Sequence, residues 1–194
     1  SGSGSSFTLN PGSYANGTVK VRQTDQAGNT STAASLISIT VDTTNPYQLQ
    51  VTSNASDSSY GLGSTLSILV VFNEAIQVTG IPRLLLETGT TDRYATYVYG
   101  TGTTTLNFNY TVQTGDQSHD LDYHSSRTLD LNGGAIKDQA GNNAALLLAI
   151  QGSSGSLSVS KNFVIDGIVP LPVRTTSPKS IYQVSKFGFS KSAD

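Results

Sequence analysis

The chain has 194 residues, of which 36% are hydrophobic and only 12% are charged, and its formal net charge at pH 7 is −2. This composition is too apolar and too strongly patterned for a disordered chain, and its 11 Lys and Arg residues form no basic patch that predicts nucleic-acid binding. No apolar run reaches the length of a membrane-spanning helix, and the absence of cysteine excludes disulfides and thiolate metal sites.

The first predicted strands lie near the N-terminus and surround a short loop. Residues 18–23 alternate inward Val19 and Val21 with polar neighbours, the period-two pattern of a half-buried strand, and residues 36–41 do the same. Between them, Asp25–Asn29 (DQAGN) is typical of a tight hairpin loop whose glycine takes a left-handed backbone conformation.

Strand-like segments continue along the chain and predict an all-β fold. Turn sequences such as Asn132-Gly133-Gly134 separate strands expected at residues 49–52, 65–72, 83–87, 93–99, 104–112, 128–131 and 161–165. Alternation in the 104–112 strand predicts that Leu106, Phe108 and Tyr110 face the core. The apolar stretch 143–150 (NAALLLAI) fits a helical turn or a strand, and the all-β context favours a strand.

An internal repeat is the most informative feature of the sequence. Asp25–Asn29 recurs unchanged as Asp138–Asn142, and each copy precedes an apolar strand that ends in Asp and is followed by Pro. The strand-ending aspartates are Asp42 and Asp166, and the prolines are Pro46 and Pro170. Such a repeat predicts a tandem array of sandwich-sized modules.

The repeat divides the chain into three predicted parts. Residues 1–45 would contain the last strands of a first domain. Residues 46–168 would form one complete domain, and residues 169–194 would begin a third domain or a terminal tail.

The residues around the repeat resemble a known family. Val21–Thr30 (VRQTDQAGNT) and Val41–Pro46 (VDTTNP) resemble the end of the bacterial immunoglobulin-like repeats of large surface adhesins and biofilm-associated proteins. The middle of the chain resembles a longer variant of these repeats, in the segments Val71–Glu74, Val78–Pro82, Leu84–Gly89, Gly115–Asp116, Asp120–Tyr123 and Ile165–Gly167. The resemblance stops after Pro170.

This resemblance implies tandem immunoglobulin-like, or cadherin-like, β-sandwich domains in a secreted or cell-surface protein. In that family the repeats are rods that project a binding tip from the cell, and calcium near the domain junctions commonly stiffens them. The partners that the resemblance implies are therefore the neighbouring immunoglobulin-like domains of the same chain and, for a binding module, a glycan or host cell-surface protein.

The scarce acidic residues, 13 in all, suggest where calcium would bind. Asp116, Asp120 and Asp122 lie close together, and Ca²⁺ prefers oxygen ligands such as carboxylates. One interpretation is a cadherin-like calcium site that this stretch shares with Glu74 or a junction aspartate. The other is a solvated acidic loop in which Asp serves as a turn former.

A second candidate calcium group combines the repeat loops with the strand ends. Asp25 and Asp138 open the two DQAGN loops, whereas Asp42 and Asp166 lie where a last strand leaves a domain. A junction ion would be coordinated at that point, although ordinary surface aspartates would fit the same pattern.

No recognisable catalytic constellation is found in the sequence. His119 and His124 are the only histidines and lie beside the acidic stretch, but their spacing matches no familiar zinc-enzyme motif. The chain has no Trp to line a sugar-cleaving groove, and it contains no nucleophile elbow or phosphate-binding loop. We therefore expect no catalytic residues and no enzyme activity.

Two non-catalytic functions remain from the sequence. The leading prediction is a calcium-stiffened extender of an extracellular adhesin, and the alternative is a glycan- or protein-binding module of such a protein. Tyr94, Tyr97 and Tyr99 could belong to a glycan platform, but tyrosines within one strand more often pack against the sheet.

Overall fold

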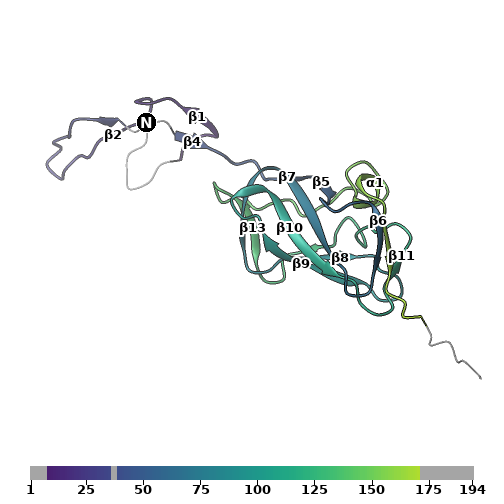
Figure 1. Ribbon diagram of the computed structural model, residues 1–194. Helices are drawn as coiled ribbons and strands as arrows, with labels where there is room; N and C mark the ends of the chain where they lie inside the picture. The colour runs from purple at the N-terminus through teal and green to yellow at the C-terminus, as the bar shows by residue number, and fades with distance from the viewer. Residues whose placement is uncertain (1–7, 36–38, 171–194) are drawn as a thin grey trace, which may run out of the picture.

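A computed structural model describes residues 8–35 and 39–170, and the regular secondary structure of these residues is nearly all β (Figure 1). The predicted all-β character is confirmed. The elements are β1 Gly12–Tyr14, β2 Lys20–Val21, β3 Ala34–Ser35, β4 Ile39–Val41, β5 Gln48–Thr52, β6 Ser58–Gly61, β7 Thr65–Thr79, β8 Arg83–Leu86, β9 Arg93–Tyr99, β10 Thr103–Thr111, β11 Gln117–Ser118, β12 Leu129–Asp130, β13 Ala135–Asp138, α1 Leu157–Ser160 and β14 Phe163–Asp166.

The N-terminal segment, residues 8–45, contains two short antiparallel pairings. β1 pairs with β4, and β2 pairs with β3. Among its described residues Val19 is the one buried hydrophobic side chain, whereas Val21 is 41% exposed instead of facing inward as predicted. No described residue of this segment joins the hydrophobic core.

The main body, residues 46–168, is built on one large sheet. Its strand order is β12-β8-β9-β10-β7-β13, and β5 pairs with β7 as well. β7 is 15 residues long because its two halves have different partners on one edge. β5 pairs with its first half and β13 with its second half, while β10 pairs along the opposite edge.

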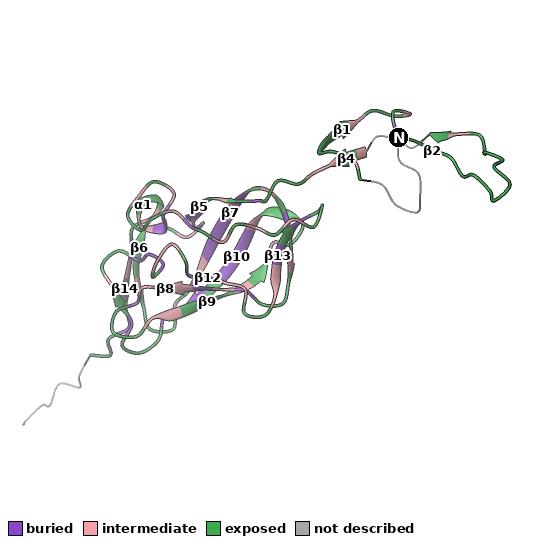
Figure 2. Cartoon of the chain, turned by 180° about the vertical axis from the view of Figure 1, so that it is seen from behind, coloured by how far each residue is buried: buried purple, intermediate pink, exposed green. Residues whose placement is uncertain are grey.

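A small three-stranded sheet completes the main body. Its order is β11-β14-β6, and β14 pairs with β6 in parallel. The core joins Phe163 and Ile165 of this sheet to Leu106, Phe108 and Tyr110 of β10, all of them at most 2% exposed. The predicted inward face of β10 is thereby confirmed, and Figure 2 shows buried residues along β7 and β10.

The predicted strand at residues 143–150 is wrong. Apart from a single bridge at Asn143, the stretch belongs to no strand or helix. Its backbone N–H groups donate to three separate parts of the molecule, so no ladder with one neighbouring strand can form. The acceptors are the carbonyls of Ile136 and Ser126 and, around the start of β5, the carbonyl of Pro46 and the side chain of Gln48. Leu148 is 3% exposed, which explains the apolar pattern.

The described residues contain no helix that is long and apolar enough to cross a membrane. The third part predicted from residue 169 onward lies outside the described residues from position 171, as do positions 36–38 of the predicted 36–41 strand.

Candidate metal site at the junction of the N-terminal segment and the main body

The two DQAGN loops fold in the same way. In each loop the first Asp accepts hydrogen bonds from the backbone N–H and the side-chain amide of the last Asn: at 2.8 and 2.9 Å in Asp25–Asn29, and at 2.8 and 2.7 Å in Asp138–Asn142. The glycines have φ angles of 90° and 96°, which a residue with a Cβ rarely adopts. The predicted tight loop with a left-handed glycine is therefore confirmed at both positions.

These hydrogen bonds keep Asp138 charged. Burial alone would raise the pKa of Asp138, but the bonds from the side chain and backbone of Asn142, and from Gly141 and Ala140, hold this pKa below its usual value. The side-chain bond from Asn29, followed by its backbone bond, likewise lowers the pKa of Asp25. Asp138 thus remains an anion at neutral pH although it is only 3% exposed.

The linker between β4 and β5, residues 42–47, is held by neutral hydrogen bonds against the part of the main body that follows it. The Asn142 side-chain amide donates to the Asp42 carbonyl at 3.1 Å. Asn73 exchanges bonds with Tyr47: its side-chain oxygen accepts the Tyr47 N–H at 2.7 Å, and its own N–H donates to the Tyr47 carbonyl at 3.0 Å. Ala145 N–H donates to the carbonyl of Pro46, a buried proline, at 2.7 Å.

This docking brings three carboxylates together from three parts of the chain. Asp42 follows β4, Glu74 lies in the middle of β7 and Asp138 ends β13, and one carboxylate oxygen from each lies within 4.8 Å of the others. A shallow hollow lined by Thr40, Gln139 and Ala140 surrounds them. Within the described part of the chain, the Arg and His side chains that pair with carboxylates do so with other residues, and none lies within 4.0 Å of these three carboxylates.

The donor set of this junction cluster, defined as Asp42, Glu74 and Asp138, suits a hard divalent cation. All of its side-chain ligand atoms are carboxylate oxygens, which Ca²⁺ and Mg²⁺ prefer over nitrogen or sulfur. Asp42 uses one oxygen to accept the Thr44 N–H at 2.9 Å, and Glu74 uses one to accept from the Asn73 side chain at 3.2 Å. Both therefore keep a second oxygen available.

Asp116, one of the predicted calcium ligands, is buried and hydrogen-bonded to protein groups. The side chain is 1% exposed, and each of its oxygens has protein partners. Oδ1 accepts from Arg93 Nε at 2.9 Å, while Oδ2 accepts from the Tyr110 hydroxyl at 2.7 Å and the Gln113 N–H at 2.9 Å. These bonds tie the end of β10 to the start of β9.

Asp120 and Asp122 lie on either side of Leu121, which is fully buried. Asp122 is 7% exposed and accepts hydrogen bonds from the Tyr123 N–H, the Gly152 N–H and the Ser158 hydroxyl. Desolvation, followed by the negative charges of Asp122 and then Asp57, raises the pKa of Asp120. The structure does not bring either aspartate into the junction cluster.

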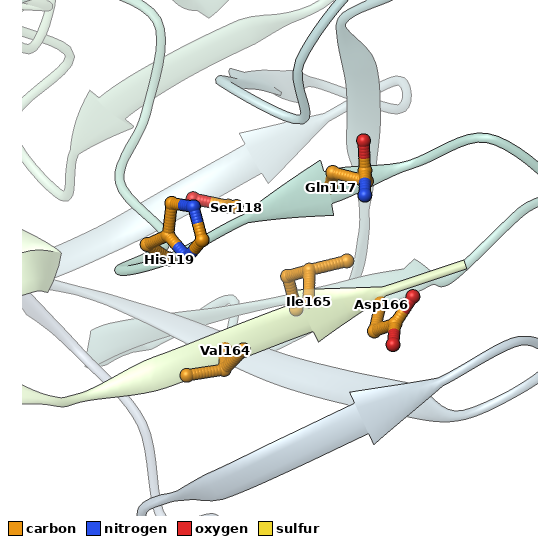
Figure 3. A pocket seen from close by; sticks show the side chains of 6 residues that line it. All are labelled: Gln117, Ser118, His119, Val164, Ile165 and Asp166. Carbon is orange, nitrogen blue, oxygen red and sulfur yellow. The ribbon is translucent and has the colours of Figure 1, made fainter. Parts of the chain in front are cut away.

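Asp166 and Asp25 also lie apart from the junction cluster. Asp166 ends β14 beside a small hollow between β11 and β14, and in Figure 3 it stands at the opposite end of that hollow from His119. Its Oδ1 accepts the Ile168 N–H at 3.1 Å, which repeats the turn that Asp42 makes with Thr44. Asp25 is exposed in the N-terminal segment.

The sequence did not reveal the two asparagines, Asn142 and Asn73, whose side chains hydrogen-bond to the linker. Asn142 was visible as the last residue of the repeat motif, but only the fold shows that its amide reaches the Asp42 carbonyl. Asn73 directly precedes Glu74 in β7, and nothing in the sequence pairs it with Tyr47.

We expect Asn142→Ala to reduce the acid sensitivity of the main body. The folded-state pKa of Asp138 is lowered, so its contribution to stability is present above the unfolded-state pKa of about 3.9 and is lost as the pH falls through the lower folded value. Removing the Asn142 amide brings the two pKa values closer together. Urea denaturation followed by Tyr fluorescence between neutral pH and about pH 3 should then show a shallower loss of stability.

Asn29→Ala is the matched control, because it removes the same bond from the loop that lies outside the core. It should leave the main-body transition unchanged. Equal pH profiles for wild type and Asn142→Ala would contradict the assignment.

Comparison with protein-family models, curated proteins and solved structures found no match to this chain.

Proposed function

We propose that this chain is a non-catalytic extender of a secreted or cell-surface adhesin, in which immunoglobulin-like β-sandwich domains follow one another and Ca²⁺ stiffens their junctions. The N-terminal segment represents the end of one domain and the main body the next. No residue is assigned a catalytic role. The family resemblance of the sequence motivates this proposal.

The observation that carries the proposal is the junction cluster. Asp42 belongs to the linker, whereas Glu74 and Asp138 belong to the main body, so an ion bound to all three would connect the two parts directly. Short linkers leave neighbouring domains free to move unless an interface holds them. Three adjacent carboxylates repel one another without a cation, so the ion favours the docked linker.

The repeated geometry extends the same arrangement to both ends of the chain. Asp25–Asn29 has the hydrogen-bond pattern of the loop that holds Asp42, and Asp166 makes the same local turn as Asp42. In a tandem array Asp25 would hold a preceding linker, and Asp166 would belong to the linker that a following domain holds. On this proposal, each copy of the sequence repeat supplies one loop and one strand-ending aspartate that join neighbouring domains.

The experiment is a Ca²⁺ titration of the full chain by isothermal calorimetry. We expect binding with a Kd of about 10⁻⁴–10⁻³ M, the range of extracellular calcium modules. Glu74→Gln keeps the side-chain volume but removes one charged ligand, and it should weaken binding by at least about tenfold. Glu87→Gln, a change in a separate group of residues, should leave Ca²⁺ binding unchanged.

Ca²⁺ binding that is absent in the wild type, or equal in wild type and Glu74→Gln, would remove the junction cluster from the proposal. Binding lost in Asp120→Ala instead would return the site to the 116–122 stretch.

The alternative function, a glycan- or protein-binding module, draws support from β9. Tyr94, Val98 and Tyr99 are 42%, 51% and 63% exposed, and the Arg83 guanidinium lies 4.1 Å from the centre of the Tyr94 ring. Exposed aromatic rings can stack on sugars. Tyr97, by contrast, packs edge-on against Phe108 with ring centres 5.9 Å apart. Glycan binding by the wild type that is lost in Tyr94→Ala would favour this alternative.

A further inference from the structure

A second group of metal-ligating atoms converges on a different part of the main body. His124 Nδ1 lies 2.9 Å from Asp92 Oδ2 and 3.1 Å from Glu87 Oε2, and these three atoms all lie within 4.8 Å of one another. The side chains are 48%, 22% and 46% exposed for His124, Asp92 and Glu87, so solvent reaches the group. One imidazole nitrogen and two carboxylates therefore share one point at the surface.

The β8–β9 hairpin positions the two carboxylates. Its last register pair joins Leu86 to Arg93, so Glu87 and Asp92 are the next residues on the two facing chains. Like charges directly opposite each other on paired chains are destabilising. Within the loop between them, the Thr88 N–H donates to Asp92 Oδ1 at 3.4 Å. The other oxygen of Asp92, Oδ2, faces His124.

His124 lies in a third chain segment, which runs along the edge of β8 that faces away from β9. Tyr123 forms a bridge with Leu86, and His124 N–H donates to the Leu85 carbonyl at 2.9 Å. Leu86 and Tyr123 are both fully buried. Because side chains alternate along extended chains, the next residues, Glu87 and His124, point outward to the same face.

From this convergence we propose that Glu87, Asp92 and His124 form a binding site for Zn²⁺ or a similar divalent transition metal. Zinc binds His nitrogen and Asp or Glu oxygen at about 2.0–2.2 Å in tetrahedral sites. In a tetrahedron of that size neighbouring ligand atoms are ~3.3 Å apart, so His124 Nδ1 needs to move only a few tenths of an ångström from each carboxylate oxygen. Water would occupy the fourth position on the exposed side.

The donor set distinguishes this zinc site from the junction cluster. An imidazole nitrogen suits Zn²⁺ and other late transition metals, whereas Ca²⁺ prefers all-oxygen surroundings. The ion would cancel the repulsion between Glu87 and Asp92 and would fasten the hairpin loop to the segment that carries His124. This inference does not depend on the proposed extender function, because none of its residues belongs to the junction cluster.

The test is a Zn²⁺ titration of the full chain in buffer with millimolar Ca²⁺, which keeps the junction cluster occupied. We expect one equivalent of Zn²⁺ to bind. In NMR spectra, the ring-nitrogen resonances of His124 should then show that Nδ1 is the metal ligand and that Nε2 carries the proton. His124→Ala should weaken binding by at least about tenfold, since even loss of an outer-shell partner costs 10–100-fold. His119→Ala, which removes the other histidine, should bind as the wild type does.

Asp92→Asn is the second variant, because it keeps the side-chain shape and should also weaken Zn²⁺ binding while circular dichroism stays unchanged. Three outcomes would overturn the proposal. One is no Zn²⁺ binding at sub-millimolar concentration, which would leave only a histidine–carboxylate ion pair. The others are equal affinity in His124→Ala and wild type, and Zn²⁺ binding that Glu74→Gln abolishes.

Discussion

Asp116→Ala is expected to destabilise the main body by about 3–5 kcal/mol, because it removes one partner of a buried charge network. Asp116 is 1% exposed, and its loss leaves the Arg93 guanidinium, itself 27% exposed, without its carboxylate. The Tyr110 hydroxyl loses its acceptor as well. Burial, followed by the hydrogen bond to Asp116, raises the pKa of Tyr110, so its hydroxyl remains a protonated donor that needs a partner.

Urea denaturation measures this loss, and the control is a pair with similar geometry in a more exposed place. Arg83 Nε lies 2.8 Å from Asp130 Oδ2, but these side chains are 36% and 42% exposed. Exposed ion pairs contribute little to stability, so Asp130→Ala should shift the unfolding midpoint far less than Asp116→Ala.

Measuring the stability of Asp116→Ala with and without Ca²⁺ distinguishes a structural role of Asp116 from the ligand role that the sequence suggested. Loss of a structural carboxylate destabilises the protein equally with and without Ca²⁺, whereas loss of a calcium ligand matters only when the ion is present. An Asp116→Ala protein that keeps wild-type stability in chelator but gains nothing from Ca²⁺ would contradict the assignment from the structure.

Much of the fold could be predicted because the strands carry strong local patterns. β9 matches its predicted range, and β10 differs from its range by one residue at each end, since both have clear apolar or aromatic alternation and glycine turns. β6 and β13 were missed because each is only four residues long, too short for a clear alternating pattern. The second half of β7 was missed because Asn73 and Glu74 interrupt the apolar run, although its pairing with β10 and β13 continues.

The candidate junction site was predictable in part. The repeat pointed to Asp138 and the strand end to Asp42, and Glu74 was already a candidate ligand. Their convergence depends on long-range pairing of β13 with β7 and on the docking of the linker, which no local pattern contains. Asp116 and Asp122 could not be separated from surface aspartates, because their buried partners come from distant segments.

The group of Glu87, Asp92 and His124 was also predictable only in part from the sequence. Glu87 ends one predicted strand, 83–87, and Asp92 directly precedes the next, 93–99, so their proximity could have been inferred by pairing these two strands as a hairpin. His124 is brought beside them by its backbone bond to Leu85, which only the fold shows.

The second large effect expected is that Ca²⁺ orders the N-terminal segment relative to the main body. With the ion bound, Asp42 is fastened to Glu74 and Asp138 in addition to the hydrogen bonds from Asn142 and Asn73. Without it, the three carboxylates repel one another and oppose the docked linker. Removing Ca²⁺ should therefore broaden the range of positions that the N-terminal segment occupies.

Pulsed electron spin resonance between spin labels at Ser13→Cys and Ser59→Cys measures this range most directly. Both positions are exposed, in β1 and β6, and the chain has no cysteine of its own to compete for the label. We predict a narrow distance distribution with saturating Ca²⁺ and a broad one in chelator, with Glu74→Gln broad in both and His124→Ala the same as wild type. Identical distributions with Ca²⁺ and with chelator in the wild type would contradict the calcium-stiffened extender.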